Sequence, residues 1–527
     1  MRALFGVELD QRGLGIEEMS MKSHGLEKAI QNPRASTGVP GLDDVLAGGF
    51  PAGHLYLIEG DPGAGKTTVG LQFLMNGAAQ HERGMYVALS ESKTELEQGA
   101  DSHGWSLDGI EIYEFAPTEK DLKREDQYSH FHPSEMEFQD TTQHILEKIE
   151  ALQPKRVVFD SLSELRLLAH DSLRFRRQIL ALKHFFLNRG CTVLLLDDRT
   201  ADVHDMQLQS IAHGVIMFER LQREFGVERR RMRVAKLRAS RFREGFHDYT
   251  IATGGVTVYP RLVAGEHRQE EPEGTALSGI AALDALWIDG IPRGTSTLVV
   301  GPAGSGKSTI VTAYAMAAAE RGEVSAIFNF DETLSTTYRR SSQLGSDLRA
   351  QVNSGMVRMV QLDPAELSPG QFVGKVREAV EKDGARCVII DSLNGFLNAM
   401  SGEHMLVAQM HELLTFLNQH GVITFLVLTL SGMLGTNITM PVDLSYLSDN
   451  VLVLRFFEAA GRLRKAISVV KKRSGKHEDT ICELSFSSRG IAVGEPLTQF
   501  HGVLTGIPSY LGSSAVLART SSEPDQR

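Results

Sequence analysis

The chain has 527 residues and a net charge of −11, with 42% hydrophobic and 23% charged residues. This length is enough for two to four domains, and the charge disfavours a surface devoted to nucleic acid. No apolar run approaches the roughly 18–20 residues that cross a bilayer, and the N-terminal stretch lacks the apolar core of a secretion signal, so we expect a cytoplasmic protein with no membrane partner.

The first half of the chain predicts alternating strands and helices after a leader, residues 1–34, that we expect to be flexible. Short apolar stretches predict buried strands at residues 54–60, 84–92 and 191–198. Segment 172–190 predicts an amphipathic helix whose end is marked by Gly190 and whose apolar face is Leu173, Ile179, Leu182 and Phe186. Near-continuous apolar strands between helices indicate an α/β fold with a mostly parallel sheet covered on both faces.

The second half of the chain repeats the first. The same phrases recur at nearly constant spacing, which indicates two copies of one domain with small insertions and deletions. The matching positions are Gly38 and Gly279, Lys66 and Lys307, Glu91 and Glu332 at a spacing of 241, Asp160 and Asp391 at 231, and Lys236 and Lys471 at 235. Towards the end of each copy, apolar alternation predicts an antiparallel β-ribbon.

These repeats set the predicted domain boundaries. We expect a first copy at residues 35–262 and a second copy at 276–497, each of a size that suits one α/β domain. Residues 263–275 between them are charged, contain Pro and Gly, and predict a linker. Residues 498–527 form a C-terminal segment whose small, polar end we expect to be flexible.

Each copy contains a glycine-rich phosphate loop after its first predicted buried strand. In the pattern G-x-x-x-x-G-K-[ST], backbone N–H groups surround phosphate oxygens at the start of a helix. The lysine reaches the β- and γ-phosphates and the next hydroxyl binds Mg²⁺, so we predict ATP and Mg²⁺ as ligands. The predicted nucleotide-binding residues are Gly60, Asp61, Pro62, Gly63, Ala64, Gly65, Lys66, Thr67 and Thr68, and Gly301, Pro302, Ala303, Gly304, Ser305, Gly306, Lys307, Ser308 and Thr309.

Acidic residues end two later strands of each copy. Asp160 and Asp391 close apolar strands, and with the loop hydroxyls Thr67 and Ser308 they predict the magnesium ligands. The strand after the first helix ends at Glu91 in one copy and at Asp331-Glu332 in the other. Carboxylates at the carboxyl edge of an open α/β sheet face the ligand crevice, so we predict that Glu91, Asp331 and Glu332 are catalytic.

Basic residues recur on the two ribbons. Lys236 and Arg238 match Lys471 and Arg473, and neither copy has an arginine beside its own loop that could stabilise the transferring phosphate. A cation inserted from a neighbouring subunit supplies about 10³–10⁵ in rate, and we predict this role for both pairs. A solvated basic ribbon is the alternative, and the run at 228–243 is also consistent with an acidic partner or nucleic acid.

Taken together, these segments resemble the KaiC family of RecA-like ATPases, over roughly residues 35–495. The ending at 500–512 is similar to that of KaiC-like proteins from non-photosynthetic bacteria. The resemblance implies two tandem RecA-like P-loop domains in a double-ringed homohexamer, with ATP at subunit interfaces. It also implies ATPase activity in the first ring, serine/threonine autokinase and autophosphatase activity in the second, a timing or signalling role, and a partner of KaiB-like or signalling type.

Two positions depart from the pattern of that family. Ser90 stands where the first of two adjacent catalytic glutamates is expected, whereas Asp331-Glu332 retains both acids, with Asp331 as the base toward a hydroxyl. The adjacent serine and threonine phosphosites correspond to Ser445 and Tyr446. The resemblance therefore implies one candidate phosphosite, Ser445, and the departure argues against an ordered two-site cycle.

Two other functions stay open at this point. An ATP-gated scaffold without autophosphorylation would share the loops, and stable phosphoserine would separate it from an autokinase. RecA-like folds also build nucleic-acid-dependent ATPases. The net charge of −11 and the lack of an aromatic and basic single-strand loop argue against that class, which salt-sensitive DNA binding would support.

Overall fold

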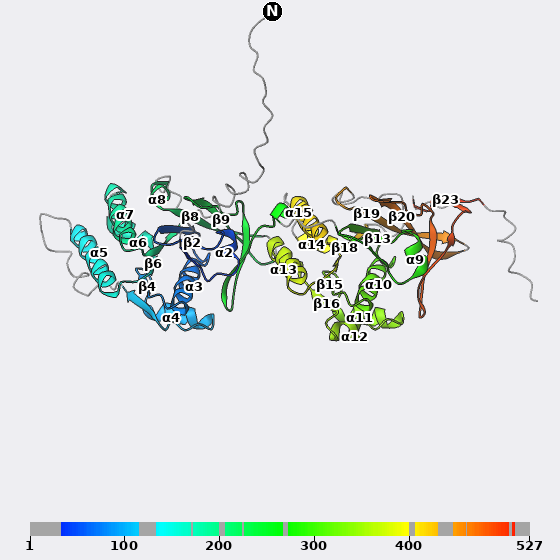
Figure 1. Cartoon of the computed structure of the whole chain (residues 1–527), viewed down its shortest axis with the longest axis horizontal. Helices are drawn as coiled ribbons and strands as arrows, with labels where there is room; N and C mark the ends of the chain where they lie inside the picture. Colours follow the sequence, from blue (N-terminus) through cyan, green and yellow to red (C-terminus); the bar gives the residue numbers. More distant parts are fainter. Residues whose placement is uncertain are drawn as a thin grey trace, which may run out of the picture. The chain divides into compact units, whose positions relative to one another are not determined.

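The computed structural model in Figure 1 describes ten stretches of the chain. These are residues 33–114, 133–169, 172–199, 206–223, 226–266, 272–399, 406–430, 446–459, 461–504 and 509–511. The chain divides into two compact units. One extends to Phe218 and takes in Val234–Glu244 and Ile251–Val256; the other contains Glu219–Arg233, Gly245–Thr250 and the chain from Thr257 onward.

The first copy contains a nine-stranded sheet in the order β11-β10-β9-β8-β3-β7-β6-β4-β5. From β8 to β5 every neighbouring pair is parallel, whereas β9 and β10 pair antiparallel. The strands are β3 (Leu55–Gly60), β4 (Gly84–Ala88), β5 (Ile110–Glu114), β6 (Arg156–Asp160), β7 (Thr192–Asp198), β8 (Gly214–Leu221), β9 (Arg229–Leu237), β10 (His247–Ala252) and β11 (Gly255–Tyr259).

The sheet of the second copy has the same topology. Its order, β22-β21-β20-β19-β14-β18-β17-β15-β16, matches the first sheet strand for strand. From β19 to β16 the pairs are parallel, and β19 to β22 form an antiparallel ribbon. The strands are β14 (Ser296–Pro302), β15 (Ser325–Asn329), β16 (Val357–Gln361), β17 (Cys387–Asp391), β18 (Ile423–Leu430), β19 (Asn450–Ala459), β20 (Arg462–Lys472), β21 (Cys482–Ser487) and β22 (Gly490–Pro496).

Helices cover both faces of each sheet, because successive strand residues point to opposite sides and both sides are apolar. The first copy has α2 (Leu42–Val45), α3 (Lys66–Ala79), α4 (Lys93–Ser102), α5 (Pro133–Leu152), α6 (Leu162–Ala169), α7 (Ser172–Leu187) and α8 (Met206–Ile211). The second has α9 (Ala281–Ala285), α10 (Lys307–Glu320), α11 (Leu334–Gln343), α12 (Leu348–Asn353), α13 (Pro369–Glu381), α14 (Leu393–Ala399) and α15 (Leu406–Gln419).

Short elements flank each sheet. The strand pairs are β1 (Arg34–Ala35) with β2 (Phe50–Pro51), β12 (Thr275–Ala276) with β13 (Ile291–Pro292), and β23 (Phe500–His501) with β24 (Ser509–Tyr510). The 3₁₀ turns are η2 (Ala264–Glu266) and η3 (Pro364–Glu366). Residues 1–32 of the predicted leader and 512–527 of the predicted tail lie outside the described residues.

The α/β fold class, the duplication and the two terminal ribbons are confirmed. One residue of the predicted apolar face of α7 is wrong, because Leu173 is 61% exposed while Phe175 is 6% exposed. Phe175, Ile179, Leu182 and Phe186 recur every three or four residues and share one side of the helix, whereas six residues separate Leu173 from Ile179 and turn it away. Among the described helices, none is long and apolar enough to cross a membrane.

Candidate functional site

The two phosphate loops lie between a central strand and the helix that follows it. β3 leads into the loop that ends at Gly65, where α3 begins, and β14 leads into the loop that ends at Gly306, where α10 begins. Within the described structure, neither helix start receives a side-chain cap, in contrast to α4, which Ser92 caps. The backbone N–H groups of these first turns are therefore available to phosphate oxygens.

Glycine is required at the last loop position of each copy. Gly65 has φ +89° and Gly306 has φ +105°, a region that other residues rarely adopt. The ribbon also leaves no room for a side chain there. A Cβ on Gly65 would lie 2.6 Å from Ile251 Cδ1 of β10, and one on Gly306 would lie 2.1 Å from Phe486 Cζ of β21. Each ribbon thus packs directly against its own phosphate loop.

The loop lysines contact their own loops. Lys66 Nζ donates to the carbonyl oxygens of Gly60 and Asp61, both at 3.0 Å, and forms an ion pair of 2.8 Å with Asp198 Oδ1. Lys307 Nζ donates to the carbonyl of Pro302 at 2.9 Å. Burial lowers the pKa of Lys307 to about 8, and the nearby carboxylates oppose that shift.

The predicted magnesium ligands come together at the carboxyl edge of each sheet. Thr67 Oγ1 donates to Asp160 Oδ2 at 2.6 Å, and in the second copy the Ser308 hydroxyl hydrogen-bonds to Asp391. Burial raises the pKa of Asp391, and the bond from Ser308 opposes the rise. A hydroxyl and a carboxylate beside a phosphate loop suit Mg²⁺, which takes oxygen ligands and keeps several waters and phosphate oxygens.

Glu91 lies at the same edge of the first sheet, just after β4. It lines a cavity of about 280 Å³ together with Thr67 and Thr68 of the phosphate loop. Burial raises the pKa of Glu91, and the carboxylates of Asp160 and Glu95 raise it further. A carboxylate with a raised pKa beside a phosphate loop is suited to accept a proton.

The acids of the second copy are held by hydrogen bonds. Asp331 accepts a hydrogen bond from the Ser392 hydroxyl. Arg340 Nη1 lies 2.6 Å from Glu332 Oε1 and 2.5 Å from Oε2, and Thr337 Oγ1 lies 3.4 Å from Oε2. Thr337 and Arg340 both belong to α11, so one helix binds the Glu332 carboxylate at two points.

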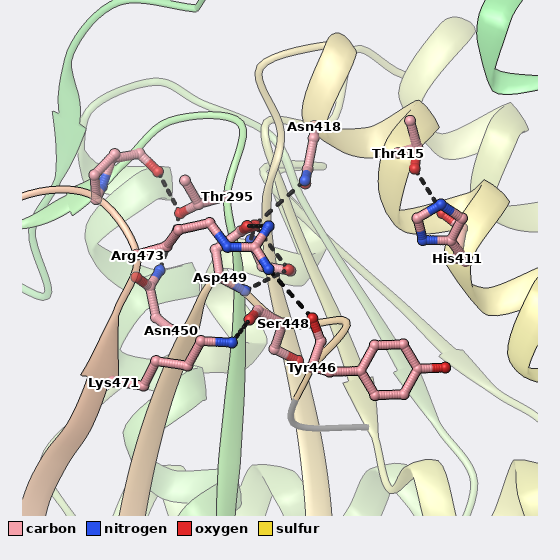
Figure 2. A network of polar contacts seen from close by, with 12 residues as sticks. Thr295, His411, Thr415, Asn418, Tyr446, Ser448, Asp449, Asn450, Lys471 and Arg473 are labelled. Atoms are coloured by element: carbon pink, nitrogen blue, oxygen red, sulfur yellow. Dashed lines mark hydrogen bonds and ion pairs between the residues drawn. The ribbon is translucent and has the colours of Figure 1, made fainter. Parts of the chain in front are cut away.

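The basic pairs bind main-chain carbonyls just ahead of β8 and β19. Lys236 donates to Gln209 and Ala212, at 2.6 and 2.8 Å, and Arg238 donates to Ser210 at 2.8 Å. In the second copy (Figure 2), Lys471 donates to the Ser448 carbonyl at 2.7 Å, and Arg473 donates to the Tyr446 carbonyl at 3.2 Å. Arg473 also forms an ion pair of 3.0 Å with Asp449.

The register of the sheet separates these pairs from the loop of their own copy. Lys471 lies opposite Val451, and Val451 lies beside Leu298, three residues before the loop begins at Gly301. Strand rise alone puts about 10 Å between these levels, and Lys471 points further from the loop, toward Ser448. Loop, magnesium ligands and glutamates therefore converge, whereas the basic pair lies at the other end of the strands.

Ser445 lies outside the described residues, but its neighbours are described. Tyr446 is 57% exposed, and Figure 2 shows its ring pointing away from Lys471 and Arg473. Ser448 is buried. The segment next to the candidate phosphosite is thus bound to the basic pair through its main chain.

The sequence analysis missed four side chains at these sites. They are Tyr86, which donates to Asp160 Oδ2 at 2.5 Å, and Asp198, Arg340 and Ser392. Asp198 could have been found because acidic residues end β7. Thr337 and Arg340 could have been found because they are three residues apart after a capped helix start, a spacing that places both on one face of α11. Tyr86 reads as an ordinary buried strand residue.

Comparison with known proteins agrees with this geometry. A family model described as "ATPase: KaiC" matches twice, at residues 35–263 and 276–498. The circadian clock protein KaiC3 of Synechocystis sp. is 24% identical over 94% of this chain and 98% of its own length. The circadian clock oscillator protein KaiC of Acaryochloris marina is 25% identical over 91% of this chain and 92% of its own. The chain therefore belongs to the KaiC family of ATPases, with the family domain present twice.

Proposed function

We propose that the chain forms a homohexameric switch whose first copy hydrolyses MgATP and whose second copy transfers the γ-phosphoryl group to Ser445. The observation that carries this proposal is the repeated convergence of a phosphate loop, a hydroxyl–aspartate pair and a strand-end glutamate. That convergence occurs in both sheets at equivalent strands. The family match supports ATP hydrolysis as the common chemistry.

In the first copy, the residues divide the work of hydrolysis. Lys66 leaves its loop carbonyls to bind the β- and γ-phosphates, and the N–H groups at the start of α3 hold the phosphate oxygens. Thr67 and Asp160 would hold Mg²⁺, which neutralises phosphate charge. Glu91 orients the attacking water and takes its proton, a role that its raised pKa favours.

In the second copy, the acceptor is a hydroxyl group of the protein. Asp331 or Glu332 takes the proton from Ser445 Oγ, which bonds to the γ-phosphorus as the bond to the ADP oxygen breaks. Lys307 and the start of α10 bind the phosphates, and Ser308 and Asp391 would hold Mg²⁺. The reverse reaction, or attack by water on the phosphoserine, gives the autophosphatase activity that the family resemblance implies.

The position of the basic pair supports an oligomer with shared sites. Lys471 and Arg473 lie at the opposite end of the strands from their own loop, which supports a role at the phosphate site of another subunit rather than at their own. The same two residues bind the main chain of Tyr446 and Ser448. If the pair reaches the ATP of a neighbour, the candidate phosphosite arrives with it.

The test is intact-mass spectrometry with phosphosite mapping after incubation with MgATP. We expect a species heavier by about 80 Da, the mass of one phosphoryl group, mapping to Ser445 and absent in Lys307→Ala. Phosphorylation that survives in Lys307→Ala would contradict the proposal, and mapping separates Ser445 from Tyr446.

An ATP-gated scaffold is the second candidate. Tyr446 in place of a threonine, with its ring turned away from the basic pair, favours this alternative. The same experiment distinguishes the two functions. ADP release without any gain in mass would indicate a two-ring ATPase that hydrolyses ATP but does not phosphorylate itself.

A further inference from the structure

Glu332 is engaged by two side chains of α11. Arg340 Nη1 lies within 2.6 Å of both carboxylate oxygens, and the Thr337 hydroxyl lies 3.4 Å from one of them. The side chains of Arg340 and Glu332 are 25% and 37% exposed. The pair is therefore well formed, yet near enough to solvent to open without burying a lone charge.

The first copy has the same glutamate without these two partners. At the domain spacing of 241, Thr337 corresponds to Leu96 and Arg340 to Gly99, both on α4. Burial raises the pKa of Glu91, and the carboxylates of Asp160 and Glu95 raise it further. The residue lines a cavity that Gly99 also lines. A Cβ on Gly99 would meet nothing within 4 Å, so this position has room for a side chain.

Both oxygens of the Glu332 carboxylate already accept charge-assisted hydrogen bonds from Arg340. A water or hydroxyl nucleophile needs one of those oxygens as its hydrogen-bond acceptor. Glu332 can therefore contact the nucleophile only after Arg340 moves away. The cost of that separation is added to the barrier of any step that uses Glu332, whereas in the described part of the chain no cation is bound to Glu91.

We infer that Arg340 is a positioning residue. By binding the Glu332 carboxylate it keeps that carboxylate from the nucleophile, and it thereby slows phosphoryl transfer in the second copy. This inference rests on the catalytic role proposed for Glu332. A purely structural pair would instead stabilise α11 with no effect on turnover, and an orienting pair would make turnover fall when Arg340 is removed. The sign of the change in kcat therefore separates the three roles.

The experiment uses the full-length chain with Glu91→Gln, so that ADP release reports on the second copy. Arg340→Ala is expected to raise kcat roughly tenfold, the factor that about 1.4 kcal/mol of lost restraint gives, with KM for ATP unchanged. Arg340→Lys is expected to give an intermediate kcat, because lysine keeps the charge but binds as a point donor. Unchanged or lower kcat in Arg340→Ala would overturn the inference.

The converse change gives an independent arm. In a Glu332→Gln chain, where ADP release reports on the first copy, Gly99→Arg is expected to lower kcat several-fold with KM for ATP unchanged. Gly99→Ala is the matched control and is expected to leave kcat unchanged, since its Cβ has open space. Equal rates in Gly99→Arg and Gly99→Ala would argue against restraint by a guanidinium. This arm stays decisive if Arg340→Ala proves unstable.

One further comparison separates failure of the inference from failure of the proposed function. Glu91→Gln/Glu332→Gln should lose the ADP release that remains in Glu91→Gln. If it retains that release, Glu332 has no catalytic role and the inference falls, whereas the proposed function falls only if Asp331→Asn also leaves the release intact. If release is lost but Arg340→Ala does not accelerate it, the proposed function stands and the inference alone is wrong.

Discussion

The phosphate sites of the two copies share a backbone frame but differ in the side chains around it. In the first copy Tyr86 and Thr67 both bind Asp160, and Asp198 binds the loop lysine. Ile327 corresponds to Tyr86 at a spacing of 241, and Thr429 corresponds to Asp198 at a spacing of 231. Arg340 lies beside Glu332, whereas the first copy has Gly99 at that position. The two copies therefore share the positions of the candidate site residues in the fold, but they differ in the side chains that contact those residues.

The opposite ends of the two sheets differ in a similar way. Ahead of β19, Asp449 accepts hydrogen bonds from Ser296 N and Oγ and pairs with Arg473. The corresponding residue of the first copy is His213, whose ring stacks on His54 with centroids 3.8 Å apart. A carboxylate therefore holds Arg473 in the second copy, whereas stacked histidine rings occupy the equivalent place in the first copy.

The largest expected effect concerns the basic pair of the second copy. Lys471→Ala/Arg473→Ala should lower phosphorylation by about 10³–10⁵, the range for a transition-state cation. When this double variant is mixed with Lys307→Ala subunits, phosphorylation should recover. The double variant supplies an intact phosphate loop, and the Lys307→Ala subunit supplies the basic pair. The exposed Arg462 on β20 gives the control Arg462→Ala, expected to behave as the wild type. A mixture that stays inactive would mean that the pair does not act between subunits.

The two glutamates should differ in their share of turnover. Glu91→Gln is expected to lower steady-state ADP release by about 10²–10⁴, as for loss of a general base. Glu332→Gln should lower total release far less, since Arg340 already restrains that residue. Both are measured in the otherwise wild-type chain. Equal losses from the two substitutions would remove the functional difference between the copies.

Substitutions of the loop glycines test the contact between each ribbon and the phosphate loop of its own copy. Gly306→Ala and Gly65→Ala should each weaken ATP binding by at least about tenfold, because alanine is strained at positive φ and its Cβ meets the ribbon. Gly306→Ala/Phe486→Ala should recover part of the affinity by removing the clash. No recovery would place the whole effect in the backbone strain. Isothermal titration with a slowly hydrolysed ATP analogue measures both.

The smallest expected effect is the pH dependence of stability that His213 of the first copy causes. Burial lowers the pKa of His213 to about 4, with a contribution from His54, whereas the unfolded chain has a value near 6.5. As pH falls from 6.5 to 4 the unfolded state takes up the proton first, so stability that is complete above pH 6.5 is lost in that window.

His213→Phe should therefore remove about 1 kcal/mol of the stability lost between pH 7.5 and pH 5, a figure reduced for the partial exposure of the ring. Urea unfolding at the two pH values measures it. His411→Phe, at an exposed position on α15, is the control and should leave the pH dependence as in the wild type. A matching change in both variants would assign the dependence to other groups.

Much of the fold could be predicted because its signals are local. Apolar strands, the glycine loops and the recurring spacing each lie within a few residues, and they gave element types, the duplication and the ribbons correctly. Contacts that depend on the order of the strands or the direction of a helix could not be predicted. Tyr86 and Asp160 are 74 residues apart and meet only because β4 and β6 are neighbours in the sheet. Arg340 reaches Glu332 only through the direction in which α11 runs.

The antiparallel ribbon of the second copy connects the phosphate loop with the basic pair. Phe486 of β21 packs on Gly306, Lys465 of β20 lies 4.7 Å above the Phe486 ring, and β20 continues to Lys471. Strands joined by hydrogen bonds move together, so any shift of the loop on losing ATP would also displace the basic pair. In a ring where that pair reaches the next subunit, the ribbon would couple ATP binding in one subunit to the position of the basic pair at the ATP site of the next. Turnover would then rise more steeply with ATP concentration than it would for independent sites.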